Sequence, residues 1–441
     1  MPKPLVAIVG RPNVGKSTLF NRLIGQMHAI VHDTAGTTRD RLFAGVSWSN
    51  RDFVIVDTGG LERESQGILG EEVQSQAHRA IKDADLVVFM VDVSQGVTPQ
   101  DMDIAQDMRQ LSKPVIVVTN KADNTKRAMG SPEFFEMGLG DPISISAYHN
   151  IGIEDLLDTL VFKLPDSHEI PIEYPAETLK LAIVGRANVG KSLMLNTLLG
   201  TDRAIVSSVA GTTRDVTDTA MEFQGRPVIL IDTAGIRRRG RIESGVERYS
   251  VLRSLRGIDR ADVVLLVLDA SELVTAQDTH IAGYIMNSYT SVVVVVNKWD
   301  LGVTLGLDEE DVRQEVLRRL RFMPYVPVRF ASALREFGLS EVMRTAMNVY
   351  QDRIQEVPSG ELSAVIARAF ADHPPPWRGR RLLRVSKVAQ EAVNPPTFAL
   401  YVNHPYLIHF SYQRYLENKI REAFGFMGTH LKLVFKPRGG R

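Results

Sequence analysis

Short runs of apolar residues alternate with longer amphipathic segments along most of the chain. In the first third, these runs are LVAIVG from Leu5, FVIVDT from Phe53, LVVFMVD from Leu86 and VIVVTN from Val115. Continuous apolar runs rich in valine and isoleucine are typical of strands that are buried on both faces of a parallel sheet. The longer segments between them predict helices on both faces of that sheet. The pattern therefore predicts an α/β domain with a mostly parallel sheet.

The same pattern occurs a second time. The segment that ends in GRPNVGKS at Ser17 reappears as a segment that ends in GRANVGKS at Ser192, an offset of 175 residues. AGTTRD, DTGG and NKAD follow in the first copy, and AGTTRD, DTAG and NKWD follow in the same order in the second. A repeat of this length indicates a duplicated domain and not a short solenoid repeat. We predict a first domain at residues 1–163 and a second at residues 178–352.

Two further segments complete the predicted organisation. Residues 164–177 contain three prolines and no apolar periodicity, which predicts a linker of limited stiffness. Residues 353–441 have the pattern helix, strand, strand, helix, strand, which predicts a small α+β domain. From Gln355 onward the chain carries 13 Lys and Arg against 6 Asp and Glu, a net charge of +7 within a chain of zero net charge. One interpretation is an anionic partner, first of all nucleic acid; the other is an ordinary solvated basic face.

The overall composition excludes several classes of protein. An apolar fraction of 44% and a charged fraction of 24% over 441 residues are typical of a soluble globular protein with about three domains. The absence of cysteine excludes disulfides and thiolate metal sites, and the cytoplasm is the expected compartment. The apolar runs are too short to span a bilayer, and neither a lipidation motif nor a basic amphipathic anchor is evident. No membrane partner is therefore expected.

Each copy contains a glycine-rich phosphate loop (P-loop) between a predicted strand and a predicted helix. Both loops satisfy GxxxxGK[ST], in which backbone N–H groups and the helix N-terminus face the phosphates. Lys16 and Lys191 are expected to reach the β and γ phosphates, and the serine hydroxyls are expected to bind Mg²⁺. The predicted phosphate-loop residues are Gly10, Arg11, Pro12, Asn13, Val14, Gly15, Lys16 and Ser17, and Gly185, Arg186, Ala187, Asn188, Val189, Gly190, Lys191 and Ser192.

The NKAD and NKWD segments select the base. Asp123 and Asp300 can accept hydrogen bonds from N1–H and the 2-amino group of guanine, which adenine cannot offer. Loss of such a match costs about 1 to 3 kcal/mol, so GTP and GDP are favoured over adenine nucleotides. The rest of the predicted pocket consists of asparagines that brace the loops, lysines that pack over the base and the backbone of two Ser-Ala pairs. These residues are Asn120, Lys121, Ser146, Ala147, Asn297, Lys298, Ser332 and Ala333.

Two DxxG segments follow predicted strands. A carboxylate at the start of DxxG can hold Mg²⁺ through water, and its glycine can turn an N–H onto the γ phosphate. The predicted nucleotide contacts in these segments are Asp57, Thr58, Gly59, Gly60, Asp232, Thr233, Ala234 and Gly235. Upstream, Thr38 and Thr213 are the favoured further Mg²⁺ ligands, and their neighbours Thr37 and Thr212 remain alternatives. Both connections are expected to act as switches that the γ phosphate orders.

The residues that follow DxxG are Leu61 and Ile236, where many GTPases have a glutamine that orients the attacking water. An apolar side chain cannot hydrogen-bond water, so hydrolysis has to depend on backbone groups and cations. The predicted catalytic groups are Lys16, Lys191, Gly60 and Gly235. Asn13 and Asn188 are candidates to bind a monovalent cation that supplies charge in the transition state.

Together these motifs resemble those of the bacterial Der family, also called EngA. The resemblance covers essentially the whole chain: two sets of GTPase motifs, RRRGRIESGVERYS after the second DTAG, and the small C-terminal domain. It implies two tandem P-loop GTPase domains and a KH-like C-terminal domain. It also implies Mg²⁺-dependent, potassium-stimulated GTP hydrolysis and a role in maturation of the large ribosomal subunit, with its rRNA as partner. A monomer is the economical expectation. The alternative is a GTPase component of an RNA-modification system, but the C-terminal segment lacks the signatures of a modifying domain.

Three features of the second half of the chain allow two interpretations each. The GFMG string from Gly425 to Gly428 matches the GxxG loop of KH domains, but its place between a helix and a strand favours a helix cap and turn. Trp377 either packs against its domain or stacks on a base. A basic run after the second DTAG is either a nucleotide-dependent RNA contact or a solvated loop; it consists of Arg237, Arg238, Arg239 and Arg241.

Overall fold

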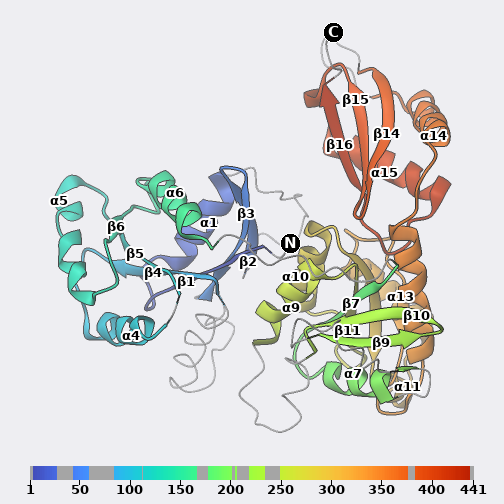
Figure 1. Cartoon of the computed structure of the whole chain (residues 1–441), viewed down its shortest axis with the longest axis horizontal. Helices are drawn as coiled ribbons and strands as arrows, with labels where there is room; N and C mark the ends of the chain where they lie inside the picture. Colours follow the sequence, from blue (N-terminus) through green and yellow to red (C-terminus); the bar gives the residue numbers. More distant parts are fainter. Residues whose placement is uncertain are drawn as a thin grey trace. The chain divides into compact units, whose positions relative to one another are not determined.

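Figure 1 shows the computed structural model of the chain, in which two compact units are distinguished. One unit comprises residues 1–172 and 243–256, and the other comprises residues 173–242 and 257–441. The structure describes residues 3–26, 43–58, 84–111, 113–165, 177–200, 204–205, 218–233, 249–375 and 383–437. Within these described ranges, the first unit contains one β-sheet and the second contains two.

The sheet of the first unit has the strand order β2-β3-β1-β4-β5-β6. Its strands are β1 (Leu5–Val9), β2 (Phe43–Trp48), β3 (Arg51–Asp57), β4 (Leu86–Asp92), β5 (Val115–Asn120) and β6 (Ile143–Ser144). All neighbouring strands are parallel except β2, which runs antiparallel to β3. The described helices are α1 (Lys16–Gln26), α4 (Pro99–Arg109), α5 (Thr125–Ala128), the 3₁₀ helix η1 (Ser131–Met137) and α6 (Ile153–Lys163).

Helices cover both faces of this sheet. On one face, Leu19 and Phe20 of α1 and Leu156 of α6 join a buried cluster with Val6 and Ile8 of β1. Helix α4 buries one side, which includes Ala105 and Met108. Strands β1 and β4 are buried over their whole length, and except for Asp92 at the end of β4 all their side chains are apolar. The prediction of a mostly parallel sheet with two covered faces is confirmed.

The second unit repeats this arrangement in a sheet of order β13-β12-β11-β7-β10-β9-β8. The strands are β7 (Leu179–Val184), β8 (Ala204–Ile205), β9 (Thr219–Phe223), β10 (Arg226–Ile231), β11 (Val263–Asp269), β12 (Ser291–Asn297) and β13 (Val328–Phe330). The described helices are α7 (Lys191–Gly200), α9 (Tyr249–Arg260), α10 (Ala276–Asn287), α11 (Trp299–Thr304), α12 (Glu309–Arg319) and α13 (Leu339–Arg353). Strands β7 and β10 to β13 are parallel, and β9 is antiparallel to β10.

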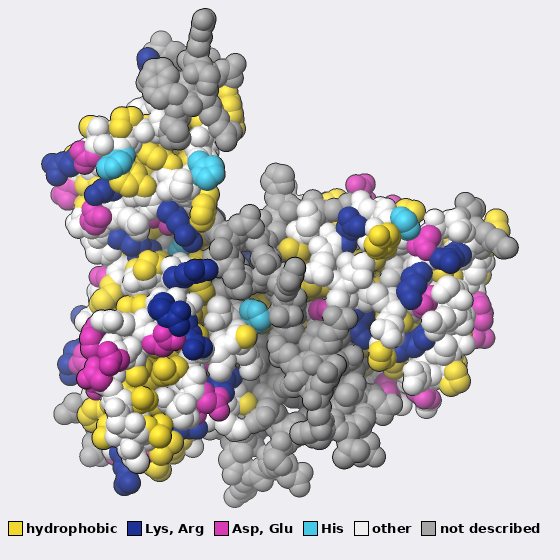
Figure 2. Space-filling view, turned by 180° about the vertical axis from the view of Figure 1, so that it is seen from behind, with side chains coloured by type: hydrophobic (Ala, Val, Ile, Leu, Met, Phe, Trp, Pro, Cys, Tyr) yellow, Lys and Arg dark blue, Asp and Glu magenta, His cyan; other side chains and the backbone are white. Residues whose placement is uncertain are grey.

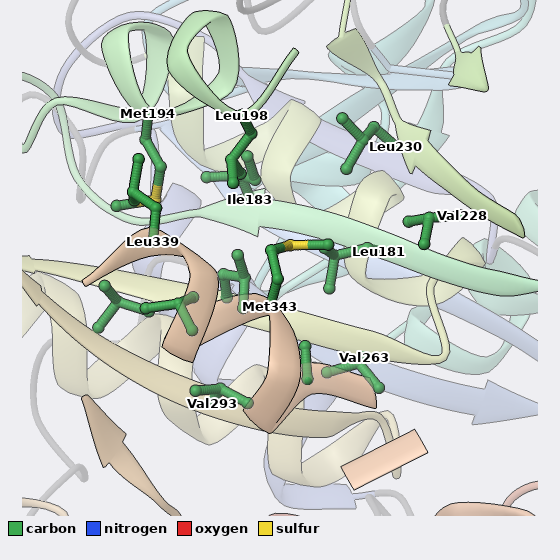
Figure 3. Packing of buried hydrophobic residues seen from close by; sticks show 14 of the residues in the cluster. Leu181, Ile183, Met194, Leu198, Val228, Leu230, Val263, Val293, Leu339 and Met343 are labelled. Atoms are coloured by element: carbon green, nitrogen blue, oxygen red, sulfur yellow. The ribbon is translucent and has the colours of Figure 1, made fainter. Parts of the chain in front are cut away.

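Figure 3 shows how α7 and α13 pack onto one face of this second sheet. Leu198 of α7 lies beside Ile183, and Met343 of α13 lies beside Leu181; both partners are on β7, and all four residues belong to one buried cluster. Each fully buried side chain of this size contributes roughly 1.5 to 3 kcal/mol relative to an exposed one. The central strand that leads into the second phosphate loop is therefore anchored by the core.

The C-terminal domain contains α14 (Ser359–Asp372), β14 (Val385–Val393), β15 (Pro396–Val402), the 3₁₀ helix η3 (Pro405–Leu407), α15 (Phe410–Phe424) and β16 (Lys432–Pro437). This order confirms the predicted αββαβ pattern. Strand β14 pairs antiparallel with β15, and β15 pairs parallel with β16. Side chains of α14 and α15, such as Leu362 and Leu416, share a core with the sheet. On the face drawn in Figure 2, the described basic side chains of this domain lie among acidic and hydrophobic ones.

The GFMG string forms a helix cap and turn that packs against the second GTPase domain. Gly425 is the C-cap of α15, and its N–H donates to the carbonyl of Arg421. The N–H of Gly428 donates to the carbonyl of Tyr325 at 2.9 Å, and the Gly428 carbonyl accepts from the N–H of Val292 at 2.7 Å. A Cβ on Gly428 would meet that same Val292 backbone. The cap interpretation is confirmed, and this backbone is engaged by protein.

The sequence predicts that the apolar runs are too short to span a bilayer, and helix length and hydropathy test this prediction. In the part of the chain that the structure describes, no helix combines the length and the apolar character needed to span a bilayer. The longest described helices, α13 and α15, are 15 residues each and carry charged side chains. Both helices bury one side in a domain core.

Candidate nucleotide-binding sites

Each phosphate loop connects a central strand to the helix that follows it. In the first copy, β1 leads through the loop into α1, and in the second, β7 leads into α7. The parallel register pairs Ile8 with Asp57 and Ala182 with Ile231, the residue before Asp232. The predicted Mg²⁺ carboxylates therefore lie at the same sheet edge as the phosphate loops, which is where ligands bind in open α/β sheets.

The phosphate-loop lysines are buried in both copies. Lys16 is 5% exposed and Lys191 is 6% exposed. The ammonium group of Lys16 donates to the carbonyls of Gly10 and Arg11 at 2.5 and 3.1 Å. That of Lys191 donates to Gly185 at 2.7 Å and to Arg186. Each lysine is thus held within its own loop, at the point where the phosphates of a nucleotide are expected.

The asparagines of NKAD and NKWD tie the phosphate loop to the base-recognition loops. The side chain of Asn120 donates to the Val14 carbonyl at 2.8 Å and accepts from the Ala147 N–H at 3.0 Å. Asn297 makes the corresponding bonds to Val189 and Ala333 at 2.7 and 3.1 Å. The predicted bracing role of both asparagines is therefore seen directly.

This close approach requires a glycine in each phosphate loop. Gly15 has φ of 102° and Gly190 has φ of 92°, both in a region that side chains rarely adopt. A Cβ at either position would overlap the side-chain nitrogen of the bracing asparagine, Asn120 or Asn297. The two loops can therefore be joined by one amide only because these positions carry no side chain.

The aspartates predicted to recognise guanine are held by serines of the neighbouring loop. The hydroxyl of Ser146 donates to Oδ1 of Asp123 at 2.7 Å, and that of Ser332 donates to Oδ1 of Asp300 at 2.5 Å. The prediction assigned these Ser-Ala pairs to the pocket through their backbone only. The structure adds that their side chains orient the carboxylates.

A buried carboxylate binds the lysine of each base-recognition motif. The ammonium group of Lys121 lies 2.6 Å from Asp92, and that of Lys298 lies 2.7 Å from Asp269. Burial acts to raise the pKa of both carboxyls, but hydrogen bonds from these lysines and from Ser94 and Ser271 outweigh it. The pKa values of both carboxyls therefore lie below the usual range for aspartate.

Sequence reasoning placed these lysines over the base and missed their carboxylate partners. The signal was available, because Asp92 ends the apolar run LVVFMVD and Asp269 ends VVLLVLD at the same place in the repeat. A charged residue at the end of a buried strand needs a partner when it is itself buried.

Replacing Asp269 by asparagine is expected to lower the thermal unfolding midpoint at pH 7. The Lys298 ion pair is lost, whereas an asparagine oxygen can still accept from Ser271. Because the Lys298 side chain is 33% exposed, the pair contributes no more than about 1 kcal/mol. The folded carboxyl has the lower pKa. The stability that the Asp269 carboxylate contributes to the fold is therefore fully present above the unfolded pKa of about 3.9 and is lost as the pH falls through the folded pKa.

The measurement is the difference in unfolding midpoint between the wild-type chain and Asp269→Asn as a function of pH. The difference should begin to shrink once the pH falls below about 4, where the unfolded carboxyl takes up a proton, and should disappear once the folded carboxyl of Asp269 is protonated as well. A difference of constant size down to the acid limit would mean that the ion pair does not contribute.

A second buried carboxylate anchors the arginine of each phosphate loop. Nε of Arg11 lies 3.2 Å from Asp101, and Nε of Arg186 lies 3.5 Å from Asp278. Both aspartates are fully buried. Each also completes a capping box with the threonine at the start of α4 or α10, which explains its position in the helix. Burial raises the pKa of Asp278, and the nearby Thr275 and Arg186 oppose this shift.

The two DxxG segments begin differently. Asp57 is the last residue of β3 and is 2% exposed, and the hydroxyl of Thr58 donates to the Ile8 carbonyl at 2.7 Å. Asp232 instead has a left-handed backbone with φ of 54°, and its N–H donates to Asp218 at 3.0 Å. The remaining predicted residues of these switches lie outside the described residues: Gly59, Gly60, Ala234, Gly235, Thr38 and Thr213, with the alternatives Thr37 and Thr212.

Other predicted features also fall outside the described residues. These are Leu61, Ile236, Trp377 and the basic run Arg237, Arg238, Arg239 and Arg241. The cation candidates Asn13 and Asn188 are described. Both are exposed and have a left-handed backbone, with φ of 67° and 60°.

Two mostly parallel sheets, each followed by a buried phosphate-loop lysine and an NKxD asparagine tied to that loop, define a P-loop GTPase with a duplicated nucleotide-binding domain. The family described as "50S ribosome-binding GTPase" matches residues 5–121 and 180–298. A second family, described as "KH-domain-like of EngA bacterial GTPase enzymes, C-terminal", matches residues 356–436.

Full-length relatives agree with this architecture. The chain is 48% identical to GTPase Der of Thermomicrobium roseum, with 99% of this chain and 97% of the relative covered. It is 47% identical to GTPase Der of Moorella thermoacetica, with 99% of both covered, and 46% identical to that of Herpetosiphon aurantiacus, with 99% and 97% covered. The chain belongs to the Der (EngA) family of GTPases. It is a GTP-binding protein that hydrolyses GTP.

Proposed function

We propose that this chain is a nucleotide-dependent switch in the assembly of the large ribosomal subunit, acting in the cytoplasm as a monomer with rRNA as its partner. The observation that carries this proposal is the match of both GTPase domains to a family described as 50S ribosome-binding. The similarity to relatives named GTPase Der, which covers 99% of this chain, agrees with it. The net charge of +7 after Gln355 supports an RNA-facing C-terminal domain.

In the proposed nucleotide sites, the phosphate-loop backbone and the N-termini of α1 and α7 bind the phosphates. Lys16 and Lys191 leave the loop carbonyls and donate to the β and γ phosphates. Asp123 and Asp300 accept from guanine, and the bracing asparagines keep the base and phosphate loops at a fixed separation. Gly60 and Gly235 donate their N–H groups to the γ phosphate, so its release frees both switches.

Magnesium is assigned to Ser17 and Asp57 in the first copy and to Ser192 and Asp232 in the second, with Thr38 and Thr213 as further ligands. Hydroxyl and carboxylate oxygens suit this ion, and the burial of Asp57 next to β1 supports the assignment. When bound, Mg²⁺ neutralises charge on the β and γ phosphates.

One potassium ion is assigned to each copy, with Asn13 as a ligand in the first and Asn188 in the second. The exposed amide of each asparagine projects from a left-handed residue in the middle of its phosphate loop, where its oxygen can serve a cation beside the phosphates. Such a cation supplies positive charge that neither Leu61 nor Ile236 can supply.

Co-sedimentation with purified ribosomal subunits tests the proposed function. The chain is incubated with each subunit under a non-hydrolysable GTP analogue, GDP or no nucleotide, in potassium or in sodium. We expect binding to the large subunit that depends on nucleotide, and a faster release of phosphate from GTP in potassium.

The matched control for this experiment is the Lys16→Ala/Lys191→Ala double variant, which should lose the nucleotide dependence. Absence of large-subunit binding in every nucleotide state would contradict the ribosomal role. Equal hydrolysis rates in the two salts would contradict the potassium assignment alone.

A further inference from the structure

The two copies differ in the charged surroundings of the aspartate that recognises guanine. In the first copy, a guanidinium nitrogen of Arg127 lies 2.5 Å from Oδ2 of Asp123, one helical turn away. The backbone N–H of Arg127 is fixed in turn by the side chain of Asn124 at 3.0 Å. Since Ser146 binds Oδ1, both carboxylate oxygens of Asp123 are engaged by the chain itself.

The second copy has the corresponding serine but has no arginine at the position that corresponds to Arg127. Ser332 donates to Oδ1 of Asp300, as Ser146 does to Asp123. The residue four positions after Asp300 is Thr304, which is exposed and whose hydroxyl donates to the backbone carbonyl of Asp300 at 2.9 Å. Throughout the described ranges, the Asp300 side chain forms no ion pair.

This difference matters because guanine needs both carboxylate oxygens. N1–H and the 2-amino group each donate to one oxygen, and each oxygen has two lone pairs. Ser146 and guanine can therefore share Oδ1, and Arg127 and guanine can share Oδ2, but the charge-assisted hydrogen bond from Arg127 competes with the neutral donor of the base for Oδ2. The positive guanidinium also lowers the attraction of the carboxylate for the positive edge of the base.

We infer that Arg127 is an affinity-determining residue of the first copy, which holds Asp123 in an ion pair that guanine has to displace or share. The first copy consequently binds guanine nucleotides less tightly than it would without this arginine. The inference rests on the proposed assignment of Asp123 to guanine.

The size of the effect follows from exposure. The Arg127 side chain is 47% exposed and that of Asp123 is 28% exposed, so the pair is in contact with solvent and is weakened by salt. Removal of such a pair should tighten nucleotide binding by about 2- to 5-fold. The arginine therefore adjusts the affinity of the first copy and does not block its site.

The test measures the dissociation constant of fluorescently labelled GDP on the full chain. A Lys191→Ala background confines the signal to the first copy, and Arg127→Gln is compared with the parent there. We expect Arg127→Gln to bind GDP about 2- to 5-fold more tightly, with the difference disappearing near 1 M salt, where the Debye length is about 3 Å. A merely structural role of Arg127 would not produce this salt dependence.

The reciprocal variant is Thr304→Arg in a Lys16→Ala background, where the second copy gives the signal. It should weaken GDP binding by a similar factor, because it creates the missing ion pair. Unchanged or weaker binding in Arg127→Gln would overturn the inference. The Asp123→Ala variant separates the assignment of Asp123 to guanine from the inference about Arg127. If Asp123→Ala weakens binding while Arg127→Gln has no effect, only the inference fails. If Asp123→Ala has no effect, the guanine assignment fails and the inference with it.

Discussion

Replacement of Lys191 by alanine is expected to lower the affinity of the second copy for GTP by about 100-fold. The lysine is 6% exposed and lies at the start of α7, where its ammonium group already donates to two loop carbonyls. A hydrogen bond to a charged group contributes about 1.5 to 3 kcal/mol, and tenfold in affinity corresponds to about 1.4 kcal/mol. Loss of the hydrogen bonds to the β and γ phosphates should therefore lower the affinity for GTP by about two orders of magnitude.

The first copy provides the control within the same molecule. Titration of the Lys191→Ala chain with a fluorescent GTP analogue should show one site of unchanged affinity and one weakened site. The Lys16→Ala variant should show the reverse assignment. Two unchanged sites in both variants would contradict the assignment of these lysines to the phosphates.

The Asp300→Asn variant is expected to change the base preference of the second copy from guanine to xanthine. The carboxylate accepts two hydrogen bonds from guanine, whereas the asparagine amide donates one and accepts one. Xanthine has a carbonyl where guanine has the 2-amino group, so it matches the amide. A site built for hydrogen bonding rejects a mismatched ligand strongly, and we expect the affinity for GTP to fall by about 100-fold or more.

Competition of GTP and XTP for the Asp300→Asn chain measures this preference. The first copy retains Asp123 and should continue to bind GTP in the same sample, which shows that the chain is folded. Ser332 can still bond to the new amide oxygen, so the loop geometry is conserved. A variant whose second copy still prefers GTP would show that Asp300 does not read the base.

Much of the fold followed from local patterns along the sequence. VVVVVN has no polar face, so it can be buried only within a sheet covered on both sides, and it forms most of β12 (Ser291–Asn297). The phosphate loops and NKxD segments follow such strands in both halves of the chain. Parallel strands end at a common edge, so these segments had to meet there.

The duplication strengthened these predictions, because each motif occurs twice in the same order. The same comparison could have exposed Asp92 and Asp269, or Asp101 and Asp278, since all four lie at corresponding places in the two copies. They were missed because a single aspartate near a strand end or helix start is most often a cap or a solvated residue.

The sequence by itself determined the class of fold, the order of the domains and the residues that approach the nucleotide, because these depend on local periodicity and on motifs of few residues. The tertiary structure decided which charges pair. Arg11 reaches Asp101, Lys121 reaches Asp92 and Arg186 reaches Asp278. It also decided that the GFMG turn packs on the second GTPase domain through Gly428. Such partners depend on the folding of distant segments onto one another and on how deeply each charge is buried, and neither is a property of a short stretch of chain.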